Sequence, residues 1–571
     1  MMRRWRAVVA VAALSIASGI RFAPDVFAQP ASTTGALHGV LHVPVTGEVA
    51  GGATIVATSP ALQGEQVAIA DDHGRYVFAS LPSGVYTLTV YYNDRTASHA
   101  GVLVQGGRDS VGDLELDLRR SAERIELVID ERLMLDEGST KTGVMIDRDF
   151  TNNVPTGRTF GDVIRVAPGA QLDAYGTSLS GATSVENVYL INGLDTTDTG
   201  FGTLSSNLPN EFVQLTEVIT GGYGAEYGHS TGGIVNVITK QGSNEFHGTV
   251  FGYYTPGSLA STANTIERSG GSIGTHQDLD RAYDVGAEVG GPIVKDKLWF
   301  HVGFDPSTQR TTNTRLIQSQ VDNVNNATGV AGGDGIPDVD PRTGITLHAP
   351  VSSSTIPEAR TTYFFTAKVN GALDPNNQFE LSVSGNPSIG DADNLHSPTT
   401  FAPGDNVFHT STGAYDASAK YTATRGDGGT RIEAIAGFHR GYSTTTPVND
   451  QERLPLTEYR YLRNLTDFED LEGAAIAPTL GGNVHDTCND ADPNDPYPKI
   501  ANCPVADYAE AGLGLLEKRT NDRWSAIVSI TQRARMLGQH TFKAGVELDA
   551  SSYTSDQAFT GGSTLTRSQL D

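Results

Sequence analysis

The sequence lacks any apolar run long enough to form a transmembrane helix. The longest one, Ala7–Ile20, falls well short of the roughly 20 residues that a helix needs to cross a bilayer. It follows three arginines and precedes the tripeptide Val-Phe-Ala at 26–28, the layout of a secretory signal peptide. We therefore expect residues 1–28 to be a signal peptide that is cleaved after Ala28.

Basic residues are scarce as well. The chain has 40 Lys and Arg against 66 Asp and Glu, a formal charge of −26. Removing residues 1–28 removes four arginines and Asp25, which leaves 36 basic and 65 acidic residues and a charge of −29. Nucleic acid is excluded as a partner, because phosphates are bound by a basic face. The acidity suits a solvated surface and leaves open a cationic or metal-complexed cargo.

A hydrolytic metal centre is also missing. A mononuclear zinc hydrolase needs about three His or carboxylate ligands and an open position for water. The 14 histidines are scattered. His38 and His42 share a face of a predicted strand, where they lie about 13 Å apart and cannot chelate one ion. We therefore expect no enzymatic activity, no catalytic residue, no cofactor and no bound metal.

An acidic loop and the two cysteines remain as candidate sites. The segment GGDGIPDVD, Gly332–Asp340, is similar to acidic calcium loops but lacks the full run of alternating aspartates, so a solvated loop is favoured. Cysteine is nearly absent, with only Cys488 and Cys503. Both lie in one long loop of an exported chain, which favours a disulfide. That bridge would stabilise the loop by about 3 kcal/mol.

Glycine, by contrast, is abundant, with 64 residues, and the chain predicts a mainly β fold. Residues 34–120 contain short alternating runs separated by turn residues. The predicted strands are Leu37–Val43, Thr54–Thr58, Gln66–Ala70, Arg75–Phe78, Val85–Tyr92 and Leu114–Leu118. Tyr86, Leu88, Val90 and Tyr92 face one way, as in a sandwich core. The pattern D-x-x-G-x-Y-x-F, followed by L-P-x-G-x-Y-x-L-x-V, resembles the carboxypeptidase regulatory-like, transthyretin-like domain.

The stretch Tyr189–Lys240 carries a second pattern. It consists of YLINGLD, LTEVITGGYGAEYG and GGIVNVITK, in which apolar strands alternate with glycine turns and two tyrosines. The second segment contains two pieces, a strand that ends in Gly-Gly and the loop AEYG, and the four pieces in this order resemble the plug domain of TonB-dependent outer-membrane receptors. The resemblance implies an α+β plug over residues 139–247. Within it, the segment Phe160–Leu172 is helix-like, because Phe160, Val163, Ile164 and Ala167 recur at helical spacing. Pro168-Gly169 is expected to stop the helical turn.

A linker, residues 121–138, lies between these two regions and contains ERIELVID. One interpretation is a last strand of the sandwich or a spacer. The position just before the plug implies, by the same resemblance, a TonB box of Ile125, Glu126, Leu127, Val128 and Ile129. Such an extended segment can add as a strand to a partner's sheet edge.

Residues 248–571 predict part of a transmembrane antiparallel β-barrel. Hairpin-like pairs with short turns alternate with the long polar insertions Asp322–Pro357 and Thr444–Asn521, as in outer-membrane barrels. Aromatic residues near the strand ends are expected in the interfacial girdles. These are Phe251, Tyr253, Trp299, Phe300, Phe364, Phe365 and Trp524. The segment GGPIVKDKLWF resembles the Oar-type receptors that begin with a carboxypeptidase regulatory-like domain.

About nine strands can be counted, against about 22 in plugged transporters, so we expect an incomplete barrel and a fragment of a longer protein. The resemblance implies a receptor in the outer membrane with its N-terminal domain in the periplasm. Its partners would be TonB, outer-membrane lipid and an extracellular ligand, which it would import with energy from TonB. A surface adhesion or assembly protein without transport is the alternative.

Overall fold

The computed structural model describes residues 34–115, 125–126 and 142–568. Gaps within these ranges fall at 44–47, 51–52, 60–64, 71–72, 93–94, 106–108, 243–245, 262–270, 296, 375–376, 394–399, 403–406, 426–429, 449–451, 461, 468–483 and 536–538. The predicted signal peptide, most of the linker and residues 127–129 of the predicted box lie outside the described residues. None of the helices in the described part is long and apolar enough to cross a membrane.

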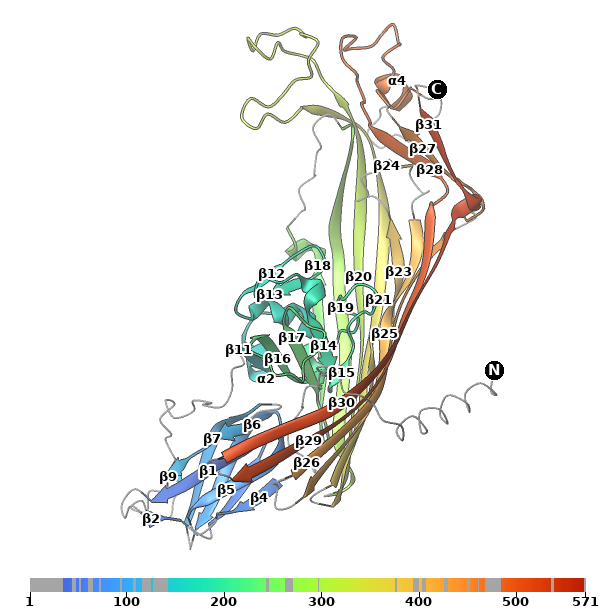
Figure 1. Ribbon diagram of the computed structural model, residues 1–571. Coiled ribbons are helices and arrows are strands. Elements are labelled where there is room, and N and C mark those ends of the chain that lie inside the picture. Colours follow the sequence, from blue (N-terminus) through green and yellow to red (C-terminus); the bar gives the residue numbers. More distant parts are fainter. Residues whose placement is uncertain are drawn as a thin grey trace, which may run out of the picture.

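The N-terminal unit is the predicted sandwich (Figure 1). One sheet has the order β2-β1-β5, with β8 and β9 parallel to β1, and the other has the order β10-β7-β6-β3-β4. The strands are β1 Thr34–Val43, β2 Glu48–Val49, β3 Thr54–Thr58, β4 Glu65–Ile69, β5 Arg75–Pro82, β6 Gly84–Tyr92, β7 Arg95–Val104, β8 Asp109–Val111, β9 Leu114–Glu115 and β10 Ile125–Glu126. Leu37, Ile55, Tyr86 and Leu88 are buried between the sheets. Strands β7 and β8 were not predicted, because their polar residues mask the alternation.

The next unit, residues 142–242, is the plug. Its sheet has the order β11-β16-β17-β14-β15, in which β14 and β17 are parallel. The strands are β11 Thr142–Asp147, β14 Val188–Ile191, β15 Leu194–Asp195, β16 Val213–Gly221 and β17 Ile234–Thr239. A separate hairpin joins β12 Ala170–Leu172 and β13 Thr177–Leu179. The helical turns are α2 Arg148–Asn153, α3 Phe160–Val163, η3 Ile164–Val166, η4 Ser184–Glu186 and η5 Asn210–Phe212.

The predicted plug helix is present, and it stops just before Pro168-Gly169, as expected. Phe160, Val163, Ile164 and Ala167 are all buried in the plug core, as their spacing predicts. The helical turns end at Val166, and Gly169 adopts a φ of 76°, which reverses the chain. Residues 170–172 therefore form strand β12 and not a third helical turn.

The C-terminal unit is a ten-stranded antiparallel sheet that curves around the plug (Figure 1). Its order is β18-β19-β20-β21-β22-β25-β26-β29-β30, with β23 paired to β21 and β25. The bounds are β18 His247–Pro256, β19 Ile273–Val294, β20 Leu298–Gln320, β21 His348–Asp374, β22 Asn377–Gly385, β23 Ser388–Asp393, β25 Val407–Arg425, β26 Thr430–Pro447, β29 Leu515–Arg535 and β30 Gln539–Phe559. A short turn, η6 Gly257–Leu259, follows β18. The predicted hairpin-like pairs are present as β19–β20, β21–β22, β25–β26 and β29–β30.

A small sheet lies at the end of the large sheet that is remote from the sandwich (Figure 1). Its order is β24-β28-β27-β31. The elements there are β24 Thr400–Phe401, β27 Leu456–Arg460, α4 Val484–Cys488, β28 Asp507–Ala511, η8 Thr560–Gly562 and β31 Thr564–Ser568. Its apolar core includes Tyr459, Leu465, Cys488, Cys503 and Tyr508, so this end of the chain is a packed unit.

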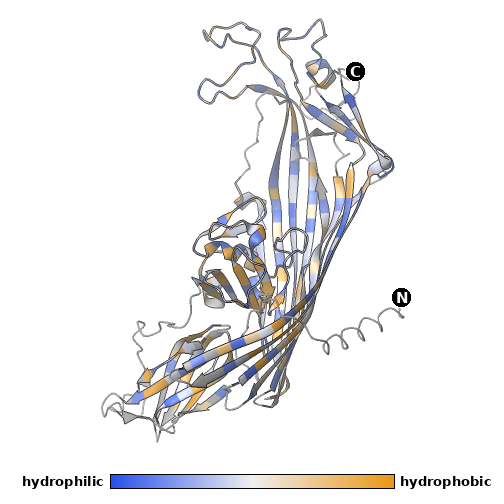
Figure 2. Ribbon diagram, in the orientation of Figure 1, coloured by the Kyte–Doolittle hydropathy of each residue, from blue (hydrophilic) through white to orange (hydrophobic). Residues whose placement is uncertain are grey.

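The large sheet has a polar inner face and an apolar outer face, and Figure 2 shows the alternation along its strands. On β19, Asp284 and Glu288 are buried towards the plug, whereas Val285 and Val289 are exposed on the opposite face. This is the alternation of a membrane barrel. Trp524, one of the aromatic residues expected in the girdle, lies on the outer face of the sheet and is 63% exposed.

Several other aromatic residues expected in the girdle face inward. Phe251 packs edge-on against Phe212 of the plug, with ring centroids 6.2 Å apart. Tyr253 donates a hydrogen bond to Glu211 Oε1 at 2.8 Å. Trp299 is buried on the same face of β20 as His301. The spacing of residues within a strand separates the two faces, but it does not say which face meets the plug.

We predict that residues 1–571 alone give no closed barrel. Among the described residues, β18 pairs only with β19, and β30 pairs only with β29. Open edges carry unpaired N–H and C=O groups that lipid cannot satisfy. Electrophoresis of outer-membrane fractions with and without heating should therefore show one mobility for this polypeptide. A fast-migrating form that is converted by boiling would contradict the prediction.

Candidate ligand-binding site

The turn between β14 and β15 explains why the sequence reads Ile-Asn-Gly-Leu. Asn192 and Gly193 have φ values of 52° and 83°. A two-residue hairpin of this hand needs positive φ at both central residues, and Asn-Gly is the preferred pair for it. The turn places Leu194 and Asp195 against the inner face of the large sheet, where Asp195 forms an ion pair with Arg523 of β29.

Asn192 does more than form the turn. Its side-chain oxygen accepts the backbone N–H of Thr239 and a hydrogen from Lys368 Nζ, each at 3.0 Å. Its amide nitrogen donates to Thr239 Oγ1 at 3.0 Å and to Ser382 Oγ at 3.3 Å. One buried side chain thus joins two plug strands to β21 and β22 of the large ten-stranded sheet. This sheet, which runs from β18 to β30, is called the wall below. Turn chemistry predicted the residue type but gave no signal for this second contact.

Other pieces of the plug pattern also supply charges that meet the wall. Lys240, which closes GGIVNVITK, forms an ion pair with Glu288 of β19, and His301 Nε2 lies 3.2 Å from the second oxygen of Glu288. Glu226 of the AEYG loop lies 3.7 Å from Lys543 of β30. The plug is therefore held by charge pairs along both sides of the curved sheet.

Arg158 of the plug contacts the first two strands of the wall, β18 and β19. Its guanidinium donates to Glu211 Oε1 at 2.7 Å and to Asp284 Oδ2 at 3.0 Å, and lies 3.4 Å from the centroid of the Tyr253 ring. Burial alone would lower the pKa of Arg158. The hydrogen bonds and charges of Glu211, followed by those of Asp284, outweigh it and raise the pKa above its usual value.

Close packing accompanies these charges. A Cβ atom placed on Gly303 of β20 would lie 2.5 Å from Phe212 Cε1, and one placed on Gly437 of β26 would lie 2.5 Å from Leu194 Cδ1. Both glycines therefore let a plug side chain reach the backbone of the wall.

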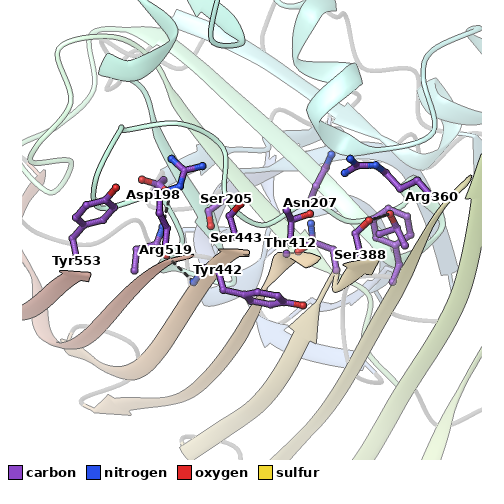
Figure 3. A pocket seen from close by; sticks show the side chains of 16 residues that line it. Asp198, Ser205, Asn207, Arg360, Ser388, Thr412, Tyr442, Ser443, Arg519 and Tyr553 are labelled. Atoms are coloured by element: carbon purple, nitrogen blue, oxygen red, sulfur yellow. Dashed lines mark hydrogen bonds between the residues drawn. The ribbon is translucent and has the colours of Figure 1, made fainter. Parts of the chain in front are cut away.

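A cavity of about 430 Å³ lies between the plug loop that follows β15 and the wall (Figure 3). The plug contributes Asp198, Ser205 and Asn207. The wall contributes residues of β21, β23, β25, β26, β29 and β30, namely Arg360, Thr362, Phe364, Ser388, Thr412, Gly413, Gly441, Tyr442, Ser443, Arg519, Asn521 and Tyr553, together with Asn386. Figure 3 shows the labelled side chains of the plug loop and of the wall strands along the cavity, with the ring of Tyr442 lying along the strands. This site combines elements that are far apart in the sequence, so no local pattern predicted it.

Hydrogen bonds couple the two sides of this cavity. Asp198 Oδ1 accepts the backbone N–H groups of Gly200 and Phe201, each at 2.8 Å. Its other carboxylate oxygen accepts a hydrogen bond from Asn521, whose own oxygen accepts Gly441 N–H at 2.7 Å. A ligand that contacts this end of the cavity would therefore act on the plug and on the wall together.

The structure separates the predicted site residues. Ile125 and Glu126 of the predicted box form β10, which is parallel to β7 of the sandwich. Cys488 and Cys503 form a disulfide with a Cα–Cα distance of 5.1 Å inside the small apolar core at the far end. The box and the bridge therefore belong to different units, and neither contributes to the cavity lining.

The acidic loop has its carboxylates engaged by backbone amides. Asp322 accepts N–H groups of Asp334 and Gly335 at 2.9 and 3.0 Å, and Asp338 accepts those of Asn323 and Val324 at 2.9 and 3.2 Å. These bonds build turns, and the side chains of Asp322 and Asp338 are buried, in contrast to the expectation of a solvated loop. Across the ranges that the structure describes, no three His, Cys, Asp or Glu side chains gather as a metal site.

Comparison with known families matches two parts of the chain. Residues 36–117 match the carboxypeptidase regulatory-like domain, and residues 238–569 match the outer membrane beta barrel domain. The second match covers more than half of the 571 residues.

Individual relatives agree with these matches. The TonB-dependent transporter Oar of Myxococcus xanthus is 32% identical over 578 residues, which cover 96% of this chain and 52% of Oar. The probable TonB-dependent siderophore receptor PirA of Acinetobacter baumannii is 33% identical over 99 residues, 17% of this chain and 11% of PirA. The chain thus spans about half the length of Oar. The resemblance to Oar-type receptors is confirmed.

Among solved structures, the outer-membrane transporter YddB of Escherichia coli is similar with a TM-score of 0.46 and 14% identity. The superposition covers 72% of this chain and 48% of YddB.

We predict that Lys240→Met loosens the plug. Lys240 and Glu288 are 4% and 6% exposed, so removing the ammonium leaves a buried carboxylate without its main counter-charge. Loss of one partner of a buried pair costs about 3–5 kcal/mol. Limited proteolysis in a urea titration should show release of the plug at lower urea than in the wild type. The matched double variant Lys240→Met/Glu288→Gln should recover part of the loss. Equal release in all three proteins would refute the role of this pair.

A second prediction concerns the disulfide. Peptide mapping by mass spectrometry without reductant should recover the peptides of Cys488 and Cys503 as one linked species, because both sulfur atoms are buried in one core. Samples alkylated before and after reduction serve as controls. Alkylation of both thiols in unreduced, membrane-extracted protein would show that the bridge is absent.

Proposed function

We propose that this chain, which belongs to the outer membrane beta barrel domain family, forms part of a receptor that binds a ligand at the cell surface and imports it with energy delivered by TonB. The supporting observation is the shared cavity, whose lining comes from both the plug and the wall. A ligand bound there contacts the element that must move for import. A barrel used only for adhesion has no need of this arrangement.

The positions of loops and turns support an orientation. In the four hairpins β19–β20, β21–β22, β25–β26 and β29–β30, one strand ends and the next begins within a few residues, at the end of the sheet where the sandwich lies (Figure 1). The long segments 321–347 and 448–514 are at the other end. Outer-membrane barrels keep short turns in the periplasm and long loops outside. The sandwich is therefore periplasmic in this proposal, and the disulfide unit faces the medium.

The cavity lining favours a polar ligand with several hydrogen-bonding groups. Asparagine, serine and threonine side chains predominate, and Phe364, Tyr442 and Tyr553 offer aromatic surface. Arg360 and Arg519 add positive charge, and Asp198 adds negative charge. Ligand specificity would then come mainly from hydrogen bonds, since a site with oriented polar groups rejects ligands that leave them unpaired.

Energy dependence separates this proposal from surface adhesion. Cells that carry the full-length protein should remove a solute from the medium that cells lacking it leave behind, and this uptake should stop when the proton gradient is discharged. Binding to the cell surface should persist after the discharge. Ligand binding with no energy-dependent uptake would favour adhesion or surface assembly.

The predicted box gives a sharper test within the full-length protein. If Ile125–Ile129 pairs with TonB by strand addition, main-chain hydrogen bonds supply most of the affinity. Leu127→Pro removes one N–H donor and restrains φ, so uptake should fall at least tenfold. Surface binding and insertion in the outer membrane should be unchanged, because the segment lies outside the plug core and the wall. Leu127→Ala, the matched control, should retain uptake. Normal uptake with Leu127→Pro would show that the box is misassigned.

A further inference from the structure

The cavity between plug and wall is basic, in contrast to the chain as a whole. The chain has a formal charge of −26, whereas the charged residues of the cavity lining are Arg360, Arg519 and Asp198. Figure 3 shows Arg519 beside Asp198 at one end of the lining and Arg360 at the other end. What a ligand meets there depends on how far the protein already neutralises each of these charges.

Asp198 offers little to a ligand, because both of its carboxylate oxygens already accept hydrogen bonds within the protein. Oδ1 accepts the backbone N–H groups of Gly200 and Phe201, each at 2.8 Å. Oδ2 accepts a hydrogen from the amide nitrogen of Asn521. These donors stabilise the negative charge of Asp198. A cationic group of a ligand would have to compete with them.

The two arginines differ in how far they are neutralised. The Nε atom of Arg519 lies 3.3 Å from Glu517 Oε2, and its guanidinium lies 5.0 Å from the centroid of the Phe201 ring. Arg360 is exposed and donates to Thr410 Oγ1 at 3.4 Å. Across the part of the chain that the structure describes, no carboxylate forms an ion pair with Arg360. Because a guanidinium has five N–H donors, most of those of Arg360 are available to a ligand.

Hydroxyl groups line the cavity between the two arginines. Figure 3 shows Ser205 of the plug loop together with Thr412 and Ser443 of the wall in this position. A Cβ atom placed on Gly441 would lie 2.6 Å from Ser205 Oγ, so the glycine lets the plug hydroxyl approach the wall. A hydroxyl donates as well as accepts, so this part of the cavity suits ligand hydroxyls and other oxygen atoms.

We infer that the cavity takes an anionic, oxygen-rich ligand whose carboxylate or phosphate group binds Arg360. This inference rests on the proposed function, since it names the ligand class of the same cavity. A guanidinium fork matches two oxygens of one carboxylate or phosphate. The volume of about 430 Å³ falls in the roughly 300–1,000 Å³ range of small-molecule sites. A cationic ligand, in contrast, would meet two guanidinium groups and one carboxylate that is already bonded.

The test uses the full-length protein in detergent and three probes that share a sugar ring, namely glucuronate, glucose 6-phosphate and glucose. Ligand-observed NMR gives the Kd of each probe. The variants are Arg360→Gln, which removes the charge, and Arg360→Lys, which keeps the charge but not the fork. Arg342→Gln is the matched control, because Arg342 is an exposed arginine of the segment 321–347 outside the cavity lining. Thermal unfolding of each variant checks that its fold is intact.

We expect at least one of the two anions to bind about tenfold more tightly than glucose, because only the anions engage the guanidinium fork. Arg360→Gln should weaken the binding of that anion about tenfold and leave glucose unchanged, and Arg360→Lys should lie between Arg360→Gln and the wild type. Arg342→Gln should bind as the wild type does. The anion that binds shows whether the site prefers a carboxylate or a phosphate.

Equal Kd values for the three probes would overturn the inference, as would the absence of binding by both anions or an equal loss in Arg342→Gln. These outcomes are distinct from failure of the proposed function. Energy-dependent uptake of a solute by a protein that binds neither anion would refute only the ligand class. Binding of an anion at Arg360 without energy-dependent uptake would refute transport and leave the anion site in place.

Discussion

Buried charge pairs between plug and wall are the constraint on which this structure depends. The inner face of the large sheet is polar, so it cannot hold the plug by apolar contact alone. Lys240 meets Glu288, Asp195 meets Arg523, and Lys368 reaches the turn at Asn192. Charges taken out of water are costly unless their geometry is good. When these charges are paired, they hold the plug in one position. When the pairs are broken, the plug can leave that position.

The cavity depends on that seating. Its two sides come from a plug loop and from strands that the chain reaches much later, and Asn521 bonds across them to Asp198. Displacement of the plug would break this bond and remove one side of the cavity. The integrity of the cavity therefore depends on the position of the plug.

Sheet edges have opposite consequences in the two environments that this chain meets. In lipid, an unpaired edge leaves backbone groups without partners, so the edges at β18 and β30 call for further strands. In water, an outermost strand is satisfied by solvent and is available for pairing. Strands β10 and β11 are both outermost in their sheets, and the chain joins them directly through residues 127–141.

The order of the units, most of the strands and the turn chemistry can be predicted from the sequence alone. These depend on contacts between near neighbours, namely the alternation of apolar residues in β6, the Asn-Gly pair at 192–193 and the glycines of the plug pattern. Only packing between distant segments determines which face of each strand meets the plug and which residues form the cavity. Tyr253 was expected in an interfacial girdle, and its ring lies against the guanidinium of Arg158 instead. Alternation of residues shows that a strand has two different faces, but not which of them contacts the plug. That is decided only when the strand packs against a distant part of the chain.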